Sequence, residues 1–250
     1  MDGAEQGGHV QHAARLVDGD RLHSALQAGA DLSPFCTLQP TPGRQWVSWA
    51  DLLADQAQFA GRAAEVRTTL TVGAVPGERV VASLVHLGLV ARLLAPPLGA
   101  ALAGGVLPVV APDGVHVLLS GSNPLPMALT DAAGIDVDSP AAVAEGLVRH
   151  WLTPLVMPWT TLVAAVARVS GQVLAGNTTS AVAGVLAVAV ATRQDLADRS
   201  VAVLDALLAG GPLAGTGGRR LDGSFTRRSC CLFYRLPDAG TCADCVLART

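Results

Sequence analysis

Lysine is missing from this sequence: all 17 basic residues are arginines. Charge of either sign is scarce at 15% of residues, and aromatic side chains account for 4%. Half of the residues are hydrophobic, so a chain of 250 residues can bury a sizeable core. The net charge of −3 provides no general attraction to nucleic acid, and we expect no nucleic-acid partner.

The opening residues, "MDGAEQGGHV", lack the basic and apolar regions of a secretion signal. We therefore expect a cytoplasmic protein in which cysteines stay reduced. The uncharged segment 169–192 is long enough to cross a bilayer. Its first half carries Ser, Gln, Asn and Thr, which hydrocarbon would penalise, so we expect a buried helix and no stable membrane insertion.

Nucleotide-binding signatures are also missing, since the glycine pairs form neither a P-loop nor a G-x-G-x-x-G turn after a strand. Nucleotide or flavin binding is therefore not indicated.

The apolar pattern predicts a mostly helical body. Val182, Val185, Leu186 and Ala189 repeat at helical spacing within a helix expected from 172 to 192. Another buried helix is expected from about 79, broken at Pro96-Pro97. Residues 106–130 contain β-branched runs separated by turn residues, which predict two or three strands. The fold class is thus α+β: a predominantly helical body with a small β-sheet, plus a small C-terminal module.

Charge divides the chain unevenly. Residues up to 210 hold 11 arginines and 17 acidic residues, whereas the remainder holds six arginines and three acidic residues. Glycine is concentrated in between. We therefore expect a body over residues 1–208, a Gly-rich hinge over 209–219 and a C-terminal metal module over 220–250.

Four of the five cysteines lie in this module with the spacing C-C-x10-C-x2-C: Cys230, Cys231, Cys242 and Cys245. Between the pairs, a strand-like "LFYRL" and a Pro-Asp-Ala-Gly turn predict a chain reversal that brings the pairs together. Four thiols in a reducing compartment indicate either one zinc ion or an iron–sulfur cluster. Adjacent side chains point to opposite sides of an extended chain, which favours the wider [2Fe–2S] cluster. Cys36 stands alone and is expected to be a small buried side chain.

The segment "CCLFYRLPDAGTCADC" resembles the C-terminal signature of the FhuF-type ferric-siderophore reductases. Weaker resemblance extends through the body from about Trp46, although Ala175 stands where a Trp is common. The resemblance implies that all four cysteines bind one [2Fe–2S] cluster. It also implies one-electron reduction of a ferric siderophore, of hydroxamate type, with electrons from a separate donor. No catalytic residue beyond the cluster is then expected.

Three side chains are candidates for substrate contact: Asn177, which precedes a Thr-Thr-Ser run, and Arg228 and Arg235, which flank the cysteines. Asn177 could equally belong to a helix start. Two other functions remain open on the sequence alone. One is a zinc-stapled protein that binds a siderophore or a partner without redox activity, and the other is a cluster-based iron or redox sensor.

Overall fold

The computed structural model of the protein describes residues 15–248. Helices account for 59% of the structure, and the strands form only small antiparallel sheets, which confirms the predicted α+β class. The α-helices are α1 (Gly19–Ala30), α2 (Trp49–Ala54), α3 (Gln56–Leu70), α4 (Glu78–Gly104), α5 (Pro140–Leu147), α6 (Met157–Ala167), α7 (Gly171–Thr192) and α8 (Ala197–Ala209).

Within the described residues, eight short strands form three sheets rather than the single one expected. The first sheet has the order β1-β6-β3 and the second β2-β4-β5, while β7 and β8 form a separate hairpin. Their bounds are β1 (Leu16–Val17), β2 (Val47–Ser48), β3 (Val106–Val109), β4 (Val115–Val117), β5 (Met127–Leu129), β6 (Ala133–Asp136), β7 (Gly217–Arg219) and β8 (Phe225–Arg227).

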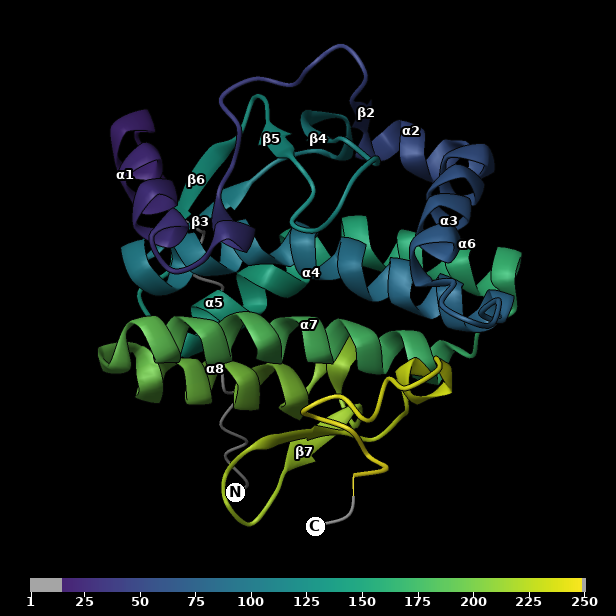
Figure 1. Cartoon of the computed structure of the whole chain (residues 1–250). Coiled ribbons are helices and arrows are strands. Elements are labelled where there is room, and N and C mark those ends of the chain that lie inside the picture. Colours follow the sequence, from purple (N-terminus) through teal and green to yellow (C-terminus); the bar gives the residue numbers. More distant parts are fainter. Residues whose placement is uncertain (1–14, 249–250) are drawn as a thin grey trace, which may run out of the picture.

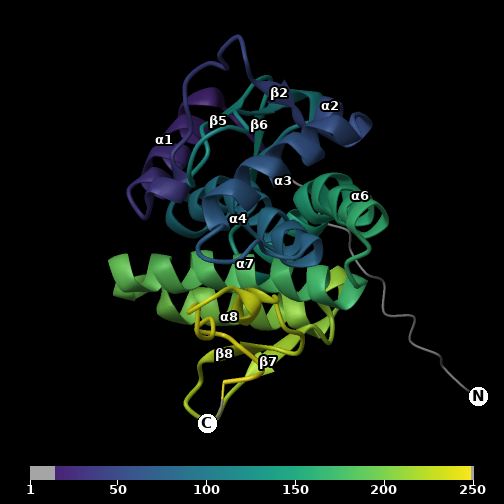
Figure 2. The same ribbon diagram turned by 45° about the vertical axis from the view of Figure 1, so that its right-hand side comes forward.

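Helices α4 and α7 lie side by side at the centre of the molecule (Figure 1). The two three-stranded sheets, with α1 and α2, lie on the far side of α4 from α7, and α8 packs beneath α7. The hairpin β7–β8 lies against α7 and α8, on the side away from those two sheets (Figure 2). Residues 227–248, which we call the cysteine segment, lie on the same side. The body therefore presents α7 as the main surface on which the C-terminal segment rests.

Helix α4 continues through Pro96 and Pro97, where we expected a break. Each proline removes one helical N–H donor, and a proline inside a helix costs about 3 kcal/mol. Both prolines are buried, however, as are nearly all residues from Val80 to Leu102. Packing on every side of this helix outweighs the local cost.

Helices α4 and α7 are also long and apolar enough to cross a membrane by length and composition. The most apolar 18-residue stretch of each helix is mostly buried inside the protein: 78% of that stretch in α4 and 56% in α7. Such burial is consistent with core helices of a soluble protein, as expected for residues 169–192.

The Gly-rich segment 209–219 has defined structure where we expected a hinge. Gly211–Leu213 forms a 3₁₀ turn, Leu213 is buried in the main core, and Gly217–Arg219 is strand β7. The segment is thus packed against the body in this structure. The division into a body and an independent module stays a prediction.

Candidate iron–sulfur site

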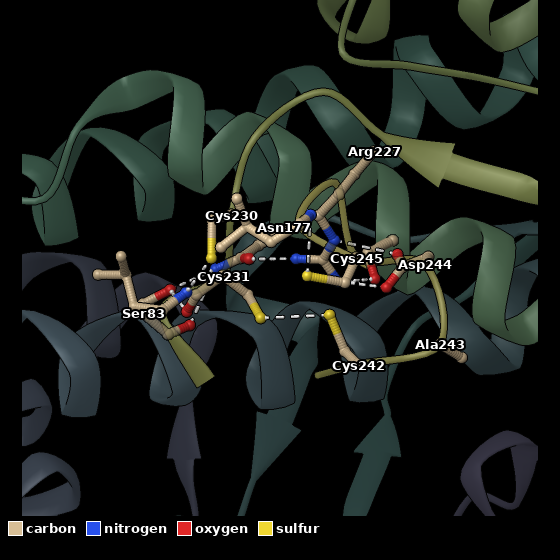
Figure 3. A network of polar contacts seen from close by, with 12 residues as sticks. Ser83, Asn177, Arg227, Cys230, Cys231, Cys242, Ala243, Asp244 and Cys245 are labelled. Atoms are coloured by element: carbon tan, nitrogen blue, oxygen red, sulfur yellow. Dashed lines mark hydrogen bonds and ion pairs between the residues drawn. The ribbon is translucent and has the colours of Figure 1, made fainter. Parts of the chain in front are cut away.

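The four C-terminal cysteines lie in irregular chain after β8. The expected strand "LFYRL" instead contains a 3₁₀ turn, Phe233–Arg235, entered through Leu232 with φ of 69°. This turn and the loop after it reverse the chain and bring Cys242 back to Cys231, with 3.6 Å between their Sγ atoms. Figure 3 shows these two sulfurs facing each other. The predicted reversal is therefore present, but a tight turn produces it.

The distance between these two sulfurs fits shared metal ligation. Two thiolates bound at about 2.3 Å to one tetrahedral metal centre are separated by about 3.8 Å. Cys231 and Cys242 are thus spaced as two ligands of a single iron. Within residues 15–248, no three His, Cys, Asp or Glu side chains form a group that could hold one metal ion. Joint ligation by all four cysteines therefore stays a prediction.

Cys230 and Cys245 share another feature, a backbone amide that donates a hydrogen bond to the sulfur. The Cys230 sulfur accepts a hydrogen bond from the Leu232 amide, and the Cys245 sulfur accepts one from the Leu247 amide, each at 3.3 Å. Amide hydrogen bonds to sulfur stabilise thiolates and tune iron–sulfur clusters. This donor set fits a [2Fe–2S] cluster.

Burial keeps the Cys230 and Cys242 thiols protonated when no metal is bound. Burial raises the pKa of Cys230, and burial also raises the pKa of Cys242 despite the nearby positive charge of Arg227. Without a metal these groups would be neutral thiols at physiological pH. A metal centre binds thiolates and supplies the energy of deprotonation. By contrast, Cys36 is 3% exposed in the body and its burial raises its pKa to about 11, as expected for a small core side chain.

A buried ion pair fixes the C-x-x-C loop. Arg227 is 2% exposed, and its guanidinium donates to both carboxylate oxygens of Asp244, at 2.9 and 3.1 Å. Burial alone would raise the pKa of Asp244, but the hydrogen bonds from Arg227 and Ser180 lower it below its usual value. Asp244 lies between Cys242 and Cys245, so this pair positions both of them.

Arg227 also connects the cysteine segment to the body. Its Nη1 donates to the Asn177 side-chain oxygen at 3.0 Å, and its Nη2 donates to Ser180 on the same helix. The Asn177 amide nitrogen donates to the carbonyl and hydroxyl oxygens of Ser83 on α4, both at 2.9 Å. Ser83 in turn donates to the Cys231 carbonyl at 2.8 Å. One continuous network therefore holds Cys231 and the Cys242–Cys245 loop against α4 and α7 (Figure 3).

The three candidate substrate residues lie in different environments. Asn177 is fully buried, and both ends of its amide are engaged in the network, so this structure gives it a positioning role and no exposed face. Arg235 is exposed and lies against the ring of Tyr234, 5.7 Å from its centroid. Arg228 is exposed and lines a cavity next to Ser229.

Sequence reasoning missed Ser83 and Asp244 as contributors to the site. Asp244 carried a usable signal, because it is an acidic residue inside a C-x-x-C motif within a basic segment. Ser83 gave none, since it is one polar residue in an apolar helix, 148 positions before its partner Cys231.

The four cysteines, with the amide donors and the buried ion pair around them, form a candidate C-terminal iron–sulfur site. Residues 227–247 match the FhuF 2Fe-2S C-terminal domain, from the buried arginine through all four cysteines. This similarity supports the resemblance to FhuF-type proteins and implies a [2Fe–2S] cluster as cofactor. It also suggests an oxidoreductase of the ferric-siderophore reductase type.

No curated protein matches the chain. The matched segment does not extend into the body, so the weaker resemblance that begins near Trp46 stays a prediction.

Proposed function

We propose that the protein is a cytosolic reductase that transfers one electron to a ferric siderophore and thereby releases Fe(II). Cys230, Cys231, Cys242 and Cys245 would hold the [2Fe–2S] cluster. When bound, this cluster supplies electrons one at a time. The observation that carries the proposal is the cysteine segment itself, which matches a 2Fe-2S domain and brings the sulfurs of Cys231 and Cys242 to 3.6 Å.

Partial exposure of the site supports electron exchange with another molecule. Cys231 and Cys245 are buried, whereas Cys230 and Cys242 are half-buried and reach the surface. One side of the cysteine segment is thus embedded in the network with the body, and the other can be approached from solvent. An iron chelate or an electron donor could come close without any opening of the fold.

The chemistry of the proposed substrate explains why electron transfer is sufficient. Hydroxamates are hard oxygen ligands that bind Fe(III) far more tightly than Fe(II). Fe(III) accepts one electron and becomes Fe(II), and the chelate then loses its iron without cleavage of any ligand bond. The protein must bind the chelate near the cysteines and set a suitable potential.

Arginines around the site favour the reduced state. Asp244 offsets the charge of Arg227, but Arg220, which donates to the carbonyls of Ala243 and Cys245, forms no ion pair within residues 15–248. Positive charge near an iron–sulfur centre stabilises the more negative, reduced form and raises its potential. Electrons would come from a separate donor protein or a small reductant.

The proposal can be tested on protein purified without oxygen. We expect about two irons and two sulfides per chain, by analogy with the cluster stoichiometry. Visible absorption should be bleached by dithionite, and the reduced protein should show a half-spin paramagnetic resonance signal. A colourless protein with stoichiometric zinc would instead establish the zinc-stapled alternative.

A kinetic experiment separates a reductase from a sensor. Reduced protein is mixed with increasing concentrations of a ferric trihydroxamate and, separately, with a chelate-free oxidant. A reductase should show saturable oxidation by the chelate, because binding precedes electron transfer. Oxidation that increases linearly with chelate concentration, and no faster than with the chelate-free oxidant, would contradict the proposal.

A further inference from the structure

A cavity of about 490 Å³ lies between the start of α7 and the residues just before Cys230. Its size is within the range of small-molecule sites. Three stretches of chain form its wall: the start of α7, the loop before β7 and the residues after β8. We call it the Arg228 cavity, and the lining residues that matter here are Gln172, Ala175, Gly215, Thr216, Arg228 and Ser229.

Arg228 differs from the other arginines of this segment. Arg219 pairs with Asp205, Arg220 donates to two carbonyls, and Arg227 is enclosed in the network. Within residues 15–248, the Arg228 guanidinium has no hydrogen-bond or ion-pair partner, and its Nη1 lies over Gly215. The cavity therefore contains a cation with its donors available.

The wall between the cavity and the cysteines is tightly packed. Ser229 donates from its hydroxyl to the Gln172 carbonyl at 2.7 Å. A Cβ atom on Gly176 would come within 2.1 Å of the Ser229 hydroxyl, so α7 and this segment are in close contact. Ser229, which lines the cavity, directly precedes Cys230 in the chain, so the cavity adjoins the segment that carries the cysteines.

Another cavity, of about 250 Å³, lies between α4 and α7, with Leu87, Ala91, Val185 and Val188 in its lining. It has no charged group in its wall. Anionic oxygens would lose their hydration there without compensation. Of these two cavities, the Arg228 cavity has the chemistry for an oxygen-rich chelate.

We propose that the Arg228 cavity binds one face of a ferric hydroxamate chelate, with the guanidinium donating to iron-bound oxygens. This inference rests on the proposed function and assigns its substrate site. The Gln172 side chain lies at the same wall and can donate a second hydrogen bond. Ala175 leaves room for the chelate because its side chain is a single methyl group.

The charge of Arg228 also suits the reaction. Fe(III) in the bound chelate gains one electron from the reduced cluster, which becomes oxidised, and the chelate becomes more negative by one charge. A fixed guanidinium interacts more strongly with that product than with the substrate. The guanidinium therefore stabilises the bound chelate more strongly after electron transfer than before it.

Binding can be measured without electron transfer by using the gallium(III) complex of desferriferrichrome. This neutral trihydroxamate complex has the charge of the ferric one but is not reduced. We expect Arg228→Ala to weaken its binding to the cluster-loaded protein about tenfold, as measured by titration calorimetry. Arg228→Lys should recover part of the loss. Ala175→Trp should weaken binding by more than tenfold, since an indole fills the cavity.

Arg193→Ala is the matched control. It removes an exposed arginine at the C-terminal end of the same helix, where Arg193 pairs, among residues 15–248, only with the neighbouring Asp195. Binding should be unchanged in this variant. The paramagnetic resonance signal verifies that each variant retains its cluster.

The outcomes separate the cavity from the proposed function. Wild-type affinity in both Arg228→Ala and Ala175→Trp would overturn the cavity assignment. Weaker binding in Arg235→Ala, together with unchanged binding in Arg228→Ala, would also overturn the cavity assignment. If the ferric complex still oxidises reduced wild-type protein saturably in these cases, the reductase function stands and the chelate binds elsewhere. If wild-type protein carries no cluster, or its reduced cluster is not oxidised, the proposed function itself fails.

Discussion

The body and the cysteine segment bury different kinds of side chain. The three largest fully buried side chains in the body are Trp49, Trp151 and Trp159, within a continuous apolar core. The largest in the cysteine segment is Arg227. The only other buried residues between 220 and 248 in the described structure are Cys231, Leu236 and Cys245. Apolar packing thus accounts for the body, whereas polar contacts and a metal must hold the segment in place.

The two regions should therefore respond to different perturbations. An apolar core is weakened by cavities and by buried groups that titrate. A short segment without such a core depends on its metal and on the contacts that orient the ligands.

Removal of a cysteine ligand should abolish the metal centre and leave the body folded. We expect Cys231→Ala to lose most of its iron, sulfide and visible absorption, because a [2Fe–2S] cluster needs four protein ligands. Far-ultraviolet circular dichroism should stay close to wild type. Cys36→Ala, in the body core, is the control and should keep its colour. A wild-type spectrum in Cys231→Ala would contradict the ligand assignment.

Removal of Arg227 should destabilise the protein strongly. Arg227→Met leaves Asp244 buried without its partner, and breaking a buried ion pair typically costs about 3–5 kcal/mol. Thermal unfolding and the rate of iron loss to a chelator measure this effect. The double variant with Asp244→Leu should recover part of the stability, because no charge is then left unpaired.

Arg219→Met provides the comparison, since its ion pair with Asp205 is partly exposed. We expect a change of about 0–1 kcal/mol in this variant. Equal effects of Arg219→Met and Arg227→Met would show that the buried network does not hold the segment.

Low pH should lower the stability of the body because His86 is buried in its neutral form. Burial lowers the pKa of His86 to about 3, so the ring is neutral in the folded protein, while in the unfolded chain it titrates near 6.5. Below pH 6.5 the unfolded state binds one more proton, and stability falls by up to about 1.4 kcal/mol per pH unit from this group. Urea unfolding between pH 7 and 4.5 measures the slope. His86→Leu should have a smaller slope, and an unchanged slope would exclude His86 as the cause.

Loss of the Ser83 hydroxyl should have a smaller effect than removal of Arg227. Ser83→Ala removes the hydrogen bond to the Cys231 carbonyl and the one that the hydroxyl accepts from Asn177, at a cost of about 1 kcal/mol each. Faster iron loss to a chelator is the expected readout. Ser200→Ala is a matched control, because Ser200 is buried and its hydroxyl has no partner within residues 15–248. Equal iron-loss rates in the two variants would contradict a role for Ser83.

Local patterns in the sequence were sufficient to predict much of the fold. The spacing of Val182, Val185, Leu186 and Ala189 predicted α7. Ser48 is of a residue type favoured at N-caps, and it caps α2 by accepting a hydrogen bond from the Asp51 amide. The C-C-x10-C-x2-C spacing predicted the iron–sulfur segment. These features depend on residues close together in the chain.

Features that depend on distant partners were not predictable in this way. Proline propensity argued against a helix through Pro96 and Pro97, but the surrounding core determined the outcome. The apolar run "LFYRL" looked like a strand, yet this segment turns to return Cys242 to Cys231. The buried position of Asn177 follows from Arg227, which lies 50 residues later.

The link between Ser83 and Cys231 also imposes an order on biosynthesis. A ribosome adds about 5–20 residues per second, so the 148 positions between these residues correspond to roughly 7–30 s. Helices α4 and α7 are therefore synthesised before any of the four C-terminal cysteines. The part of the chain that contacts Cys231 is made first, and the cysteine ligands are added to it last.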